Sequence, residues 1–587
     1  MSLLLHEIPN NPKFGQDVKK YIFELESRIC TLGFFKATAA KSQLEPKESS
    51  QFFVDCIDAI EKAFAPDINS YSAMRWIYYL RRTPHAVFSG KLVSTGPSTR
   101  ALAEIYAQRS LKIEQANPGK QGFVFPVEEG TLRHIARFVA FVLIVYDLQV
   151  GYRYANKGCC FRFPDRSLQG AWSIGRAPPS SFRPSGRALI SALPTRCPDA
   201  LIESAVRIYD ERHNQQSTFL GFALQRAGLA DNADRSGEVR STTPVNQSIW
   251  GMRDESWFAP QELLKGHINA AMYGNDGCVV IRFGPHDLNL DALFEIHRLP
   301  SMSRISIDER ASLCLLVLLL GGHLLQSRRY SFLRTMEVGY FVVDPEEWES
   351  IGKEQYDPIQ HRVRQFLPQF VAPSTFLEFS AKCLELEGSA WPLVHGDPVR
   401  VSRDYVSIDM WAASMAFLAA YQFPKVQGQI ANDRATKFED VVQDLIDGTA
   451  WADKRLGADR QRTLYMDGKA VTDIDAIGSL DGVLLLISCK SIPYSLEYDR
   501  GSHNAIRNAR STLDEAVDYW AGIVDSFEAR RHGDNYDFRG YLRIIGLVCT
   551  PFAVYTTHVK ALSQTTPSLR WANSLDELAR FLRQGVV

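Results

Sequence analysis

Apolar residues recur at helical spacing through most of the first 250 positions. The segments 52–64, 128–148 and 200–229 each place their apolar residues on one side of a helix, and each therefore predicts a helix. Between them, 170–198 and 231–248 are rich in polar residues, without apolar periodicity, and predict loops. We expect residues 1–250 to form a mainly helical region.

Residues 251–430 show a different pattern. The runs 277–283 and 338–343 are short, rich in β-branched and aromatic residues, and predict strands. The apolar run 311–325 is 15 residues long and contains His323. Because a membrane span needs about 20 apolar residues, we expect a buried helix there. This middle region should be mixed α/β, with no membrane contact.

Residues 431–587 alternate helical and strand patterns. Helical spacing over 435–446 is followed by two β-rich runs, 471–477 and 483–490, with a turn over 478–482 that ends in Asp-Gly, a hairpin signal. A long amphipathic helix over 506–524, a strand over 542–548 and a helix over 575–582 complete the pattern. A turn is also expected at Asp467-Gly468, with an extra strand before it.

The polar residues of the predicted hairpin lie where its two strands meet. Side chains alternate between the faces of a strand, so Asp473 and Asp475 share one face, while Ser488 and Lys490 share a face of the partner strand. A lysine that ends an almost wholly apolar strand can therefore meet an acid. The alternative is an ordinary hairpin with solvated aspartates, in which Lys490 protects an exposed sheet edge.

With these residues and their spacing, the segment 432–587 resembles the PD-(D/E)XK nuclease superfamily, in particular its Mrr-like and Holliday-resolvase-like members. That family carries an acid in one strand, Glu/Asp-X-Lys at the end of the next, and a glutamate on an upstream helix. Asp475 and Lys490 stand 15 positions apart, and Glu439 follows Phe438 in the upstream helical segment. The resemblance implies an α/β restriction-endonuclease-like core in the order helix, β-hairpin, helix, strand.

The resemblance also implies a site and its chemistry. Asp475 and Glu439 would bind Mg²⁺ or Mn²⁺, and the backbone carbonyl of Cys489 would add an oxygen. Lys490 would position the attacking water and stabilise charge at phosphorus. The motif carboxylate is replaced by Ser488, a poorer ligand for a hard cation; Glu439 and Asp473 are the candidates to fill its place.

The expected activity is hydrolysis of DNA phosphodiester bonds by a Mg²⁺-dependent endodeoxyribonuclease. Two alternatives stay open. The serine is also compatible with a catalytically degenerate core that binds nucleic acid or protein without cutting, and an RNA substrate would need the same site chemistry. Basic residues near the start of the 506–524 helix are candidates to hold the DNA backbone, because a helix N-terminus favours phosphate; they are Arg500, Arg507 and Arg510.

A second group of arginines lies in the first region. Arg75, Arg81 and Arg82 surround Trp76 and Tyr78. They fit a core helix with a rim of arginines, and less well a surface that stacks on bases.

Composition and the absence of certain motifs limit the classes of protein to which this chain can belong. The net charge of −1 excludes a global field that attracts nucleic acid, so any binding surface must be local. Ten cysteines without CxxC spacing predict a reducing cytoplasm and no structural zinc. Neither a Walker phosphate loop nor GxGxxG occurs, which argues against an ATP-driven motor.

The resemblance covers only residues 432–587. A large helical region in front of such a core is typical of bacterial defence and restriction effectors, by analogy of layout alone. We therefore expect residues 1–430 to sense a signal, bind a partner protein or form a homo-oligomer, and to control access to the site.

Overall fold

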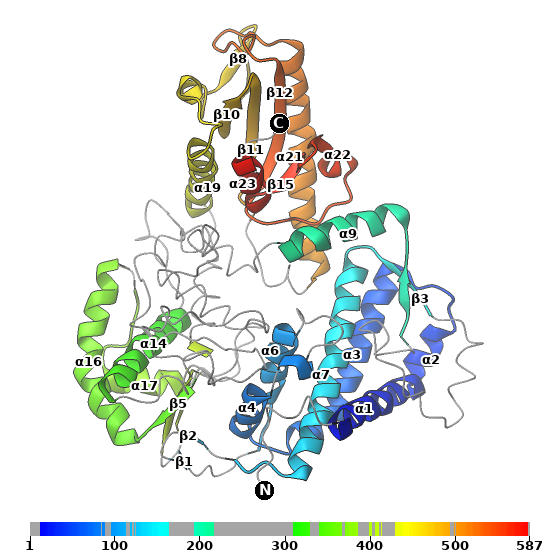
Figure 1. The fold of residues 1–587 in the computed structure, drawn as a ribbon, viewed down its shortest axis with the longest axis vertical. Helices are drawn as coiled ribbons and strands as arrows, with labels where there is room; N and C mark the ends of the chain where they lie inside the picture. Colours follow the sequence, from blue (N-terminus) through cyan, green and yellow to red (C-terminus); the bar gives the residue numbers. More distant parts are fainter. Residues whose placement is uncertain are drawn as a thin grey trace.

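The computed structural model describes residues 12–83, 85–88, 96–112, 118–119, 122–123, 125–163, 193–215, 309–328, 340–366, 370–384, 398–401, 405–409, 412–413, 429–492, 498 and 501–584. Within them the chain combines helices with several small sheets, as expected of a multidomain α/β protein. Figure 1 shows a helical part, a mixed part and a C-terminal part that carries the largest sheet.

The helical part is built around three long helices, α1 (Pro12–Thr31), α3 (Pro46–Ile68) and α7 (Glu129–Asn156), which pack side by side (Figure 1). Aromatic side chains fill the space between α3 and α7, and the rings of Phe64 and Phe141 stack 4.2 Å apart. The predicted helices over 52–64 and 128–148 are confirmed. Shorter helices surround this bundle: α2 (Gly33–Ala39), α4 (Ala73–Arg82), α5 (His85–Phe88), α6 (Gly96–Ala107) and α9 (Ala200–Gln215).

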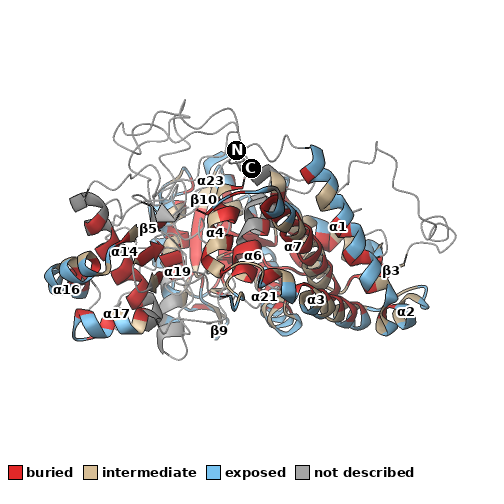
Figure 2. Ribbon diagram, turned by 90° about the horizontal axis from the view of Figure 1, so that it is seen from below, coloured by how far each residue is buried: buried red, intermediate tan, exposed pale blue. Residues whose placement is uncertain are grey.

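Helices α9 and α7 differ in how far the described residues follow the sequence pattern. Helix α9 confirms the predicted 200–229 helix as far as Gln215, and the rest of that segment lies outside the described residues. Helix α7 is long and apolar enough to cross a membrane by length and composition over Gly130–Asn156. A buried core helix passes the same test, and 67% of its most apolar window is buried here (Figure 2).

The mixed part contains a small antiparallel sheet in the order β5 (Tyr340–Val343), β7 (Val406–Asp409), β6 (Val399–Val401). Around it lie α14 (Glu309–Arg328), α16 (Pro345–Phe366) and α17 (Phe376–Leu384). The predicted helix over 311–325 is confirmed as α14. The predicted strand over 338–343 is confirmed as β5 from Tyr340 onward, and residues 338–339 lie outside the described residues. The predicted strand over 277–283 lies outside the described residues.

The preceding region contains a short hairpin, β1–β2 (118–119 and 122–123), and an antiparallel pair of distant strands, β3 (Cys160–Arg162) and β4 (Thr195–Cys197). The loop predicted over 170–198 is therefore wrong at 195–197, where backbone pairing with β3 forms a strand, and residues 170–192 lie outside the described residues.

A buried charge cluster joins α4 to this sheet. The guanidinium of Arg81 lies 3.0 Å from a carboxylate oxygen of Glu104 and 2.9 Å from one of Asp409, and all three side chains are 0% exposed. The expected arginine rim is therefore wrong for Arg81, because two buried acids from distant segments offset the cost of burying its charge. Arg75 does lie over an aromatic ring, 4.2 Å from the centroid of Tyr71.

The C-terminal part is a four-stranded sheet in the order β10 (Ala476–Leu480), β11 (Val483–Cys489), β12 (Arg543–Thr550), β15 (Ala572–Ser574). The first pair is antiparallel and the other two are parallel. Helices α19 (Gln429–Asp447) and α23 (Leu575–Gln584) cover one face of the sheet, and α21 (His503–Ala529) covers the other. The predicted succession of helix, hairpin, helix and strand is present.

Alternation along β11 explains this three-layer packing. Leu485 and Ile487 face α19 and α23, whereas Leu484 and Leu486 face α21. A strand covered on both faces must be apolar at every position, and β11 is buried throughout. Small elements complete this part: η7 (Lys454–Ala458), α22 (Val559–Leu562), and the hairpins β8 (Leu464–Met466)–β9 (Lys469–Thr472) and β13 (Gln564–Thr566)–β14 (Leu569–Arg570).

The hairpin differs from the prediction in its first strand. The expected strand over 471–477 is broken at Asp473, so β9 ends at Thr472 and pairs with β8, and a new strand, β10, begins at Ala476. The turn is shorter than predicted and consists of Asp481 and Gly482, whose φ values of 48° and 79° are those of a tight two-residue hairpin turn. The turn at Asp467-Gly468, with φ values of 52° and 73°, is confirmed.

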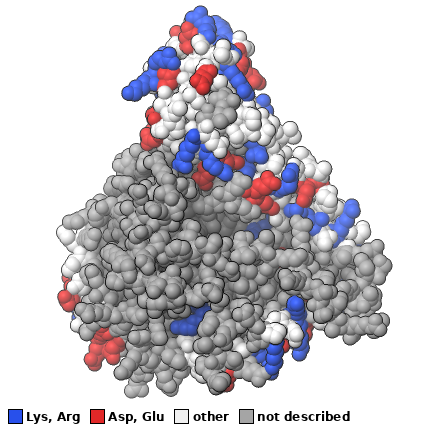
Figure 3. Space-filling model, in the orientation of Figure 1, with Lys and Arg blue, Asp and Glu red and all other residues white. Residues whose placement is uncertain are grey.

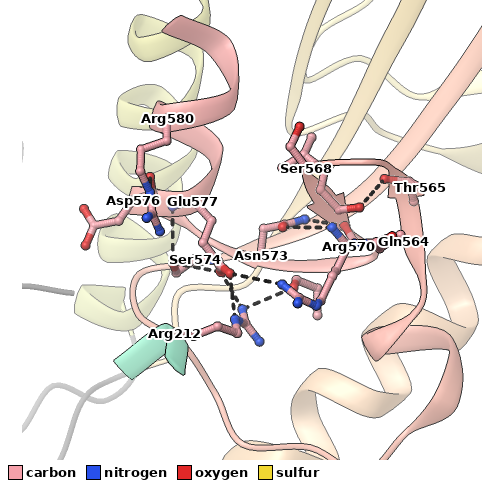
Figure 4. Close-up of polar contacts among 12 residues, drawn as sticks. Arg212, Gln564, Thr565, Ser568, Arg570, Asn573, Ser574, Asp576, Glu577 and Arg580 are labelled. Atoms are coloured by element: carbon pink, nitrogen blue, oxygen red, sulfur yellow. Dashed lines mark hydrogen bonds and ion pairs between the residues drawn. The ribbon is translucent and has the colours of Figure 1, made fainter. Parts of the chain in front are cut away.

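Helices of the helical part contact the C-terminal sheet layer. The guanidinium of Arg212 on α9 makes paired contacts with the carboxylate of Glu577 on α23, at 2.8 and 2.6 Å (Figure 4). Nearby, the hydroxyl of Tyr555 donates to the carbonyl of Lys157 at 2.7 Å. The ammonium of Lys157 lies 3.8 Å from the ring centroid of Tyr209. We call these five residues the junction.

Candidate active site

The site forms where the first strand of the hairpin begins and the second ends. Ala476 pairs with Ile487, and this register places Asp475 opposite Ser488. One carboxylate oxygen of Asp475, Oδ2, accepts a hydrogen bond from the backbone N–H of Cys489 at 2.5 Å and one from the Ser488 hydroxyl at 3.3 Å. These two donors hold the Asp475 carboxylate at the end of β11.

Glu439 reaches the same place from α19. Phe438, Val442 and Ile446 pack that helix against the sheet, and Glu439 follows Phe438 at the edge of this apolar face. Its Oε2 accepts a hydrogen bond from the side-chain amide of Gln461 at 3.3 Å. The packing of the helix thus brings an acid from a distant segment to the Asp475 end of the hairpin.

The surroundings of the two acids are linked by Gln461, which bonds to Glu439 and to the residue before Asp475. Partial burial raises the pKa of Glu439, and the charge of Asp475 raises it further. Burial also raises the pKa of Asp475, although the Cys489 N–H and the charge of Lys490 partly offset this. The ammonium of Lys490 therefore acts on the same carboxylate.

Lys490 leaves the sheet directly after β11. Its backbone N–H donates to the carbonyl of Cys549 at 2.9 Å, which continues the pairing of β11 with β12 for one more residue. Its side chain is half-buried. Asp473 is exposed in the break between β9 and β10, and its charge has a smaller effect on the pKa of Asp475. It lies at the margin of the site.

One oxygen of each acid stays available. Within the described part of the chain, the hydrogen bonds engage only Oε2 of Glu439 and Oδ2 of Asp475. Two neighbouring carboxylates and the carbonyl of Cys489 are hard oxygen donors of the kind that Mg²⁺ and Mn²⁺ prefer, and Mg²⁺ commonly keeps several waters besides one or two carboxylates. These donors fit such an ion. The described residues contain no group of three or more acidic, histidine or cysteine ligands.

The predicted DNA-contacting arginines are not equally placed. Arg507 is exposed, with its guanidinium 3.4 Å from the side-chain oxygen of Asn508. Arg510 forms an ion pair with Asp514 at 3.1 Å on the same helix. Its charge also acts on Tyr555, a junction residue. Arg500 lies outside the described residues. On the face shown in Figure 3, basic and acidic side chains intermix over the described C-terminal part.

Sequence patterns did not reveal Arg460 and Gln461. Besides the bond from Gln461 to Glu439, the guanidinium of Arg460 donates to the backbone carbonyl of Asp475 at 3.1 Å and to the Asp440 carboxylate at 2.7 Å. Neither belongs to a motif or to an apolar pattern, so only the tertiary contacts identify them.

Comparisons with protein-family models, with curated proteins and with solved structures found no match to this chain.

Proposed function

We propose that residues 431–587 act as a Mg²⁺-dependent endodeoxyribonuclease of the PD-(D/E)XK type. The observation that carries the proposal is how hydrogen bonds bring the segments of Glu439 and Asp475 together. Gln461 contacts Glu439 through its side chain and the residue before Asp475 through its backbone, and the residue before Lys490 donates to the Asp475 carboxylate. Like charges held together in partly buried surroundings are costly, and such arrangements cluster at functional sites. The order of helix, hairpin, helix and strand around them also supports the proposal.

In this proposal each side chain has a distinct task. Glu439 and Asp475 would hold Mg²⁺ or Mn²⁺ through their available oxygens, together with the Cys489 carbonyl. The bound ion would neutralise phosphate charge and lower the pKa of a water molecule. Lys490 would donate a hydrogen bond to the attacking water or to a phosphate oxygen, which stabilises the charge that develops during hydrolysis.

The preceding region would control access to the site. This is supported by the junction, through which α9 and the residue after α7 contact the C-terminal part. A conformational change in the helical part would therefore alter contacts of the C-terminal part. A role as an effector of bacterial defence, triggered through residues 1–430 by a partner protein or by self-association, is the biological context we propose.

A second candidate function is binding without cleavage. It is favoured by one observation: Oδ2 of Asp475 is satisfied by two protein donors, one of them the serine that replaces the motif carboxylate. A satisfied acid of this kind also occurs in sites with a purely structural role.

The test is cleavage of plasmid DNA, linear DNA and RNA by the full chain with Mg²⁺ or Mn²⁺, alongside Lys490→Ala. We expect metal-dependent cutting of DNA and a loss of about 10²–10³-fold in the variant. Lys469→Ala, which removes an exposed lysine of β9 in the same part of the chain, is the matched control. If wild type and Lys490→Ala are equally inert and both bind DNA, the binding function is favoured instead.

A further inference from the structure

Residues 460 and 461 form a short link between α19 and the chain that leads into β10. Arg460 pairs with Ile474 in an isolated parallel bridge, and the backbone N–H of Gln461 donates to the carbonyl of Ile474 at 2.9 Å. The link is therefore fixed to the residue directly before Asp475.

The side chains of the link reach both acids or their neighbours. The Arg460 guanidinium bridges the Asp475 carbonyl and the Asp440 carboxylate, and so ties the hairpin to α19. The Gln461 amide holds one oxygen of Glu439. Arg460 therefore contacts the backbone of one proposed ligand, Asp475, and Gln461 contacts the side chain of the other, Glu439.

The backbone of Gln461 adds an independent observation. Its φ of 53° lies in the left-handed region, which residues with a β-carbon rarely adopt. The other described non-glycine residues with positive φ, Asp467 and Asp481, each begin a two-residue hairpin turn before a glycine, where the turn requires this conformation. Gln461 is followed by Arg462 and lies in no hairpin turn. Unfavourable backbone conformations of this kind are often retained for function.

We propose that Arg460 and Gln461 are positioning residues, which hold the carboxylates of Glu439 and Asp475 in the arrangement that binds the divalent cation. This inference rests on the proposed function. Residues that orient metal ligands without touching the metal commonly change its affinity by about 10–100-fold when they are replaced.

The test compares Gln461→Gly with Asp481→Gly in the full chain. Both changes place glycine at a left-handed position, where it is readily accommodated, and only the first removes a contact with a proposed ligand. We expect neither variant to have a lower melting temperature than wild type. Calorimetric titration with Mn²⁺ should show about 10-fold weaker binding for Gln461→Gly, and unchanged binding for Asp481→Gly.

Arg460→Met serves as a second variant, because it removes the bridge to Asp440 without altering the backbone. It should also weaken Mn²⁺ binding by about 10-fold. Equal Mn²⁺ affinity in wild type, Gln461→Gly and Arg460→Met would overturn the positioning role while leaving the proposed nuclease intact. A wild-type chain that binds no Mn²⁺ would overturn both.

Discussion

Two glutamates of the C-terminal part, on helices that cover the same face of the sheet, have opposite surroundings. The Glu577 side chain on α23 is only 10% exposed, and this partial burial by itself would raise its pKa. The charge and hydrogen bonds of Arg212, with the Ser574 bonds, instead hold it below the ordinary value (Figure 4). For Glu439 on α19, partial burial and the charge of Asp475 both act in the same direction and raise its pKa. The charge of Glu577 is thus balanced by a cationic side chain of the protein, whereas the main charge that acts on Glu439 is that of another acid.

The difference separates a structural role from a proposed functional one. A buried acid that only stabilises the fold needs a cationic partner, as Glu577 has in Arg212 and as Glu104 and Asp409 have in Arg81. An acid kept beside another acid raises the free energy of the folded state unless a cation binds. We therefore expect replacement of the two kinds of acid, or of their partners, to change stability in opposite directions.

The largest effect is expected for Arg212→Ala. It leaves the Glu577 carboxylate, whose side chain is 10% exposed, without its main partner. Breaking a buried ion pair from one side typically costs about 3–5 kcal/mol. Urea unfolding measures the decrease in the free energy of unfolding, and hydrogen exchange of the α23 amides shows whether that helix is the part destabilised.

The control for this prediction lies on the same helix. Arg207 pairs with Glu211 at 3.8 Å, and both side chains are more than half exposed, so Arg207→Ala should cost less than about 1 kcal/mol. Equal losses in the two variants would show that the junction is no stronger than a surface pair.

A smaller effect is expected for Ser488→Asp, which restores an acid at the motif position. Ser488 is buried, and its hydroxyl lies 3.3 Å from Asp475. A third carboxylate there should lower stability by about 1–3 kcal/mol without metal. Mn²⁺ should then raise the melting temperature more than in wild type.

Ser488→Ala is the reference for this change, because it loses only one long hydrogen bond, worth about 1 kcal/mol. If Mn²⁺ stabilises Ser488→Asp no more than Ser488→Ala, Ser488 does not lie at a metal site.

Glu439→Gln should act in the opposite direction from Arg212→Ala. It removes one of two like charges, so the free energy of unfolding should rise by about 0.2–1 kcal/mol at neutral pH, the size of a partly exposed charge pair. Cleavage should be lost at the same time, as happens when a functional site is stabilised at the expense of activity. A variant that is both less stable and fully active would contradict the comparison.

The smallest effect is the pH dependence of these differences. Because the pKa of Glu577 is lower in the folded chain, its ionisation stabilises the fold. This contribution to the free energy of unfolding is complete above the unfolded pKa, about 4.3, and is lost as the pH falls through the folded pKa. The raised folded pKa of Glu439 gives a penalty that is absent below about pH 4.3 and grows as the pH rises through the folded pKa.

Melting temperatures from pH 3 to 8 of wild type, Glu439→Gln and Glu577→Gln test these signs. As the pH rises, the melting temperature of Glu439→Gln should increase relative to that of wild type, and the melting temperature of Glu577→Gln should decrease relative to it. Parallel curves would show that neither acid differs between the folded and unfolded chain.

The sequence by itself determined the order of elements in the C-terminal part. The apolar run of β11 predicted a strand, and the Asp-Gly pair predicted its hairpin. These are local properties, because a two-residue turn and the period of a strand depend on residues next to one another. The same locality predicted α7 and α14 from their apolar runs.

Only the tertiary structure decided how distant segments meet. The pattern over 471–477 looked like one strand, but contacts of Ile474 and Asp475 with residues 460 and 461 break it. The pairing of Arg81 with Asp409, and of Arg212 with Glu577, joins residues hundreds of positions apart. Side-chain periodicity describes which face a residue lies on, whereas a charge partner is set by packing of whole elements. For that reason the sequence alone places Glu439 on a helix and Asp475 in the hairpin, whereas the residues that contact these acids are evident only from the tertiary structure.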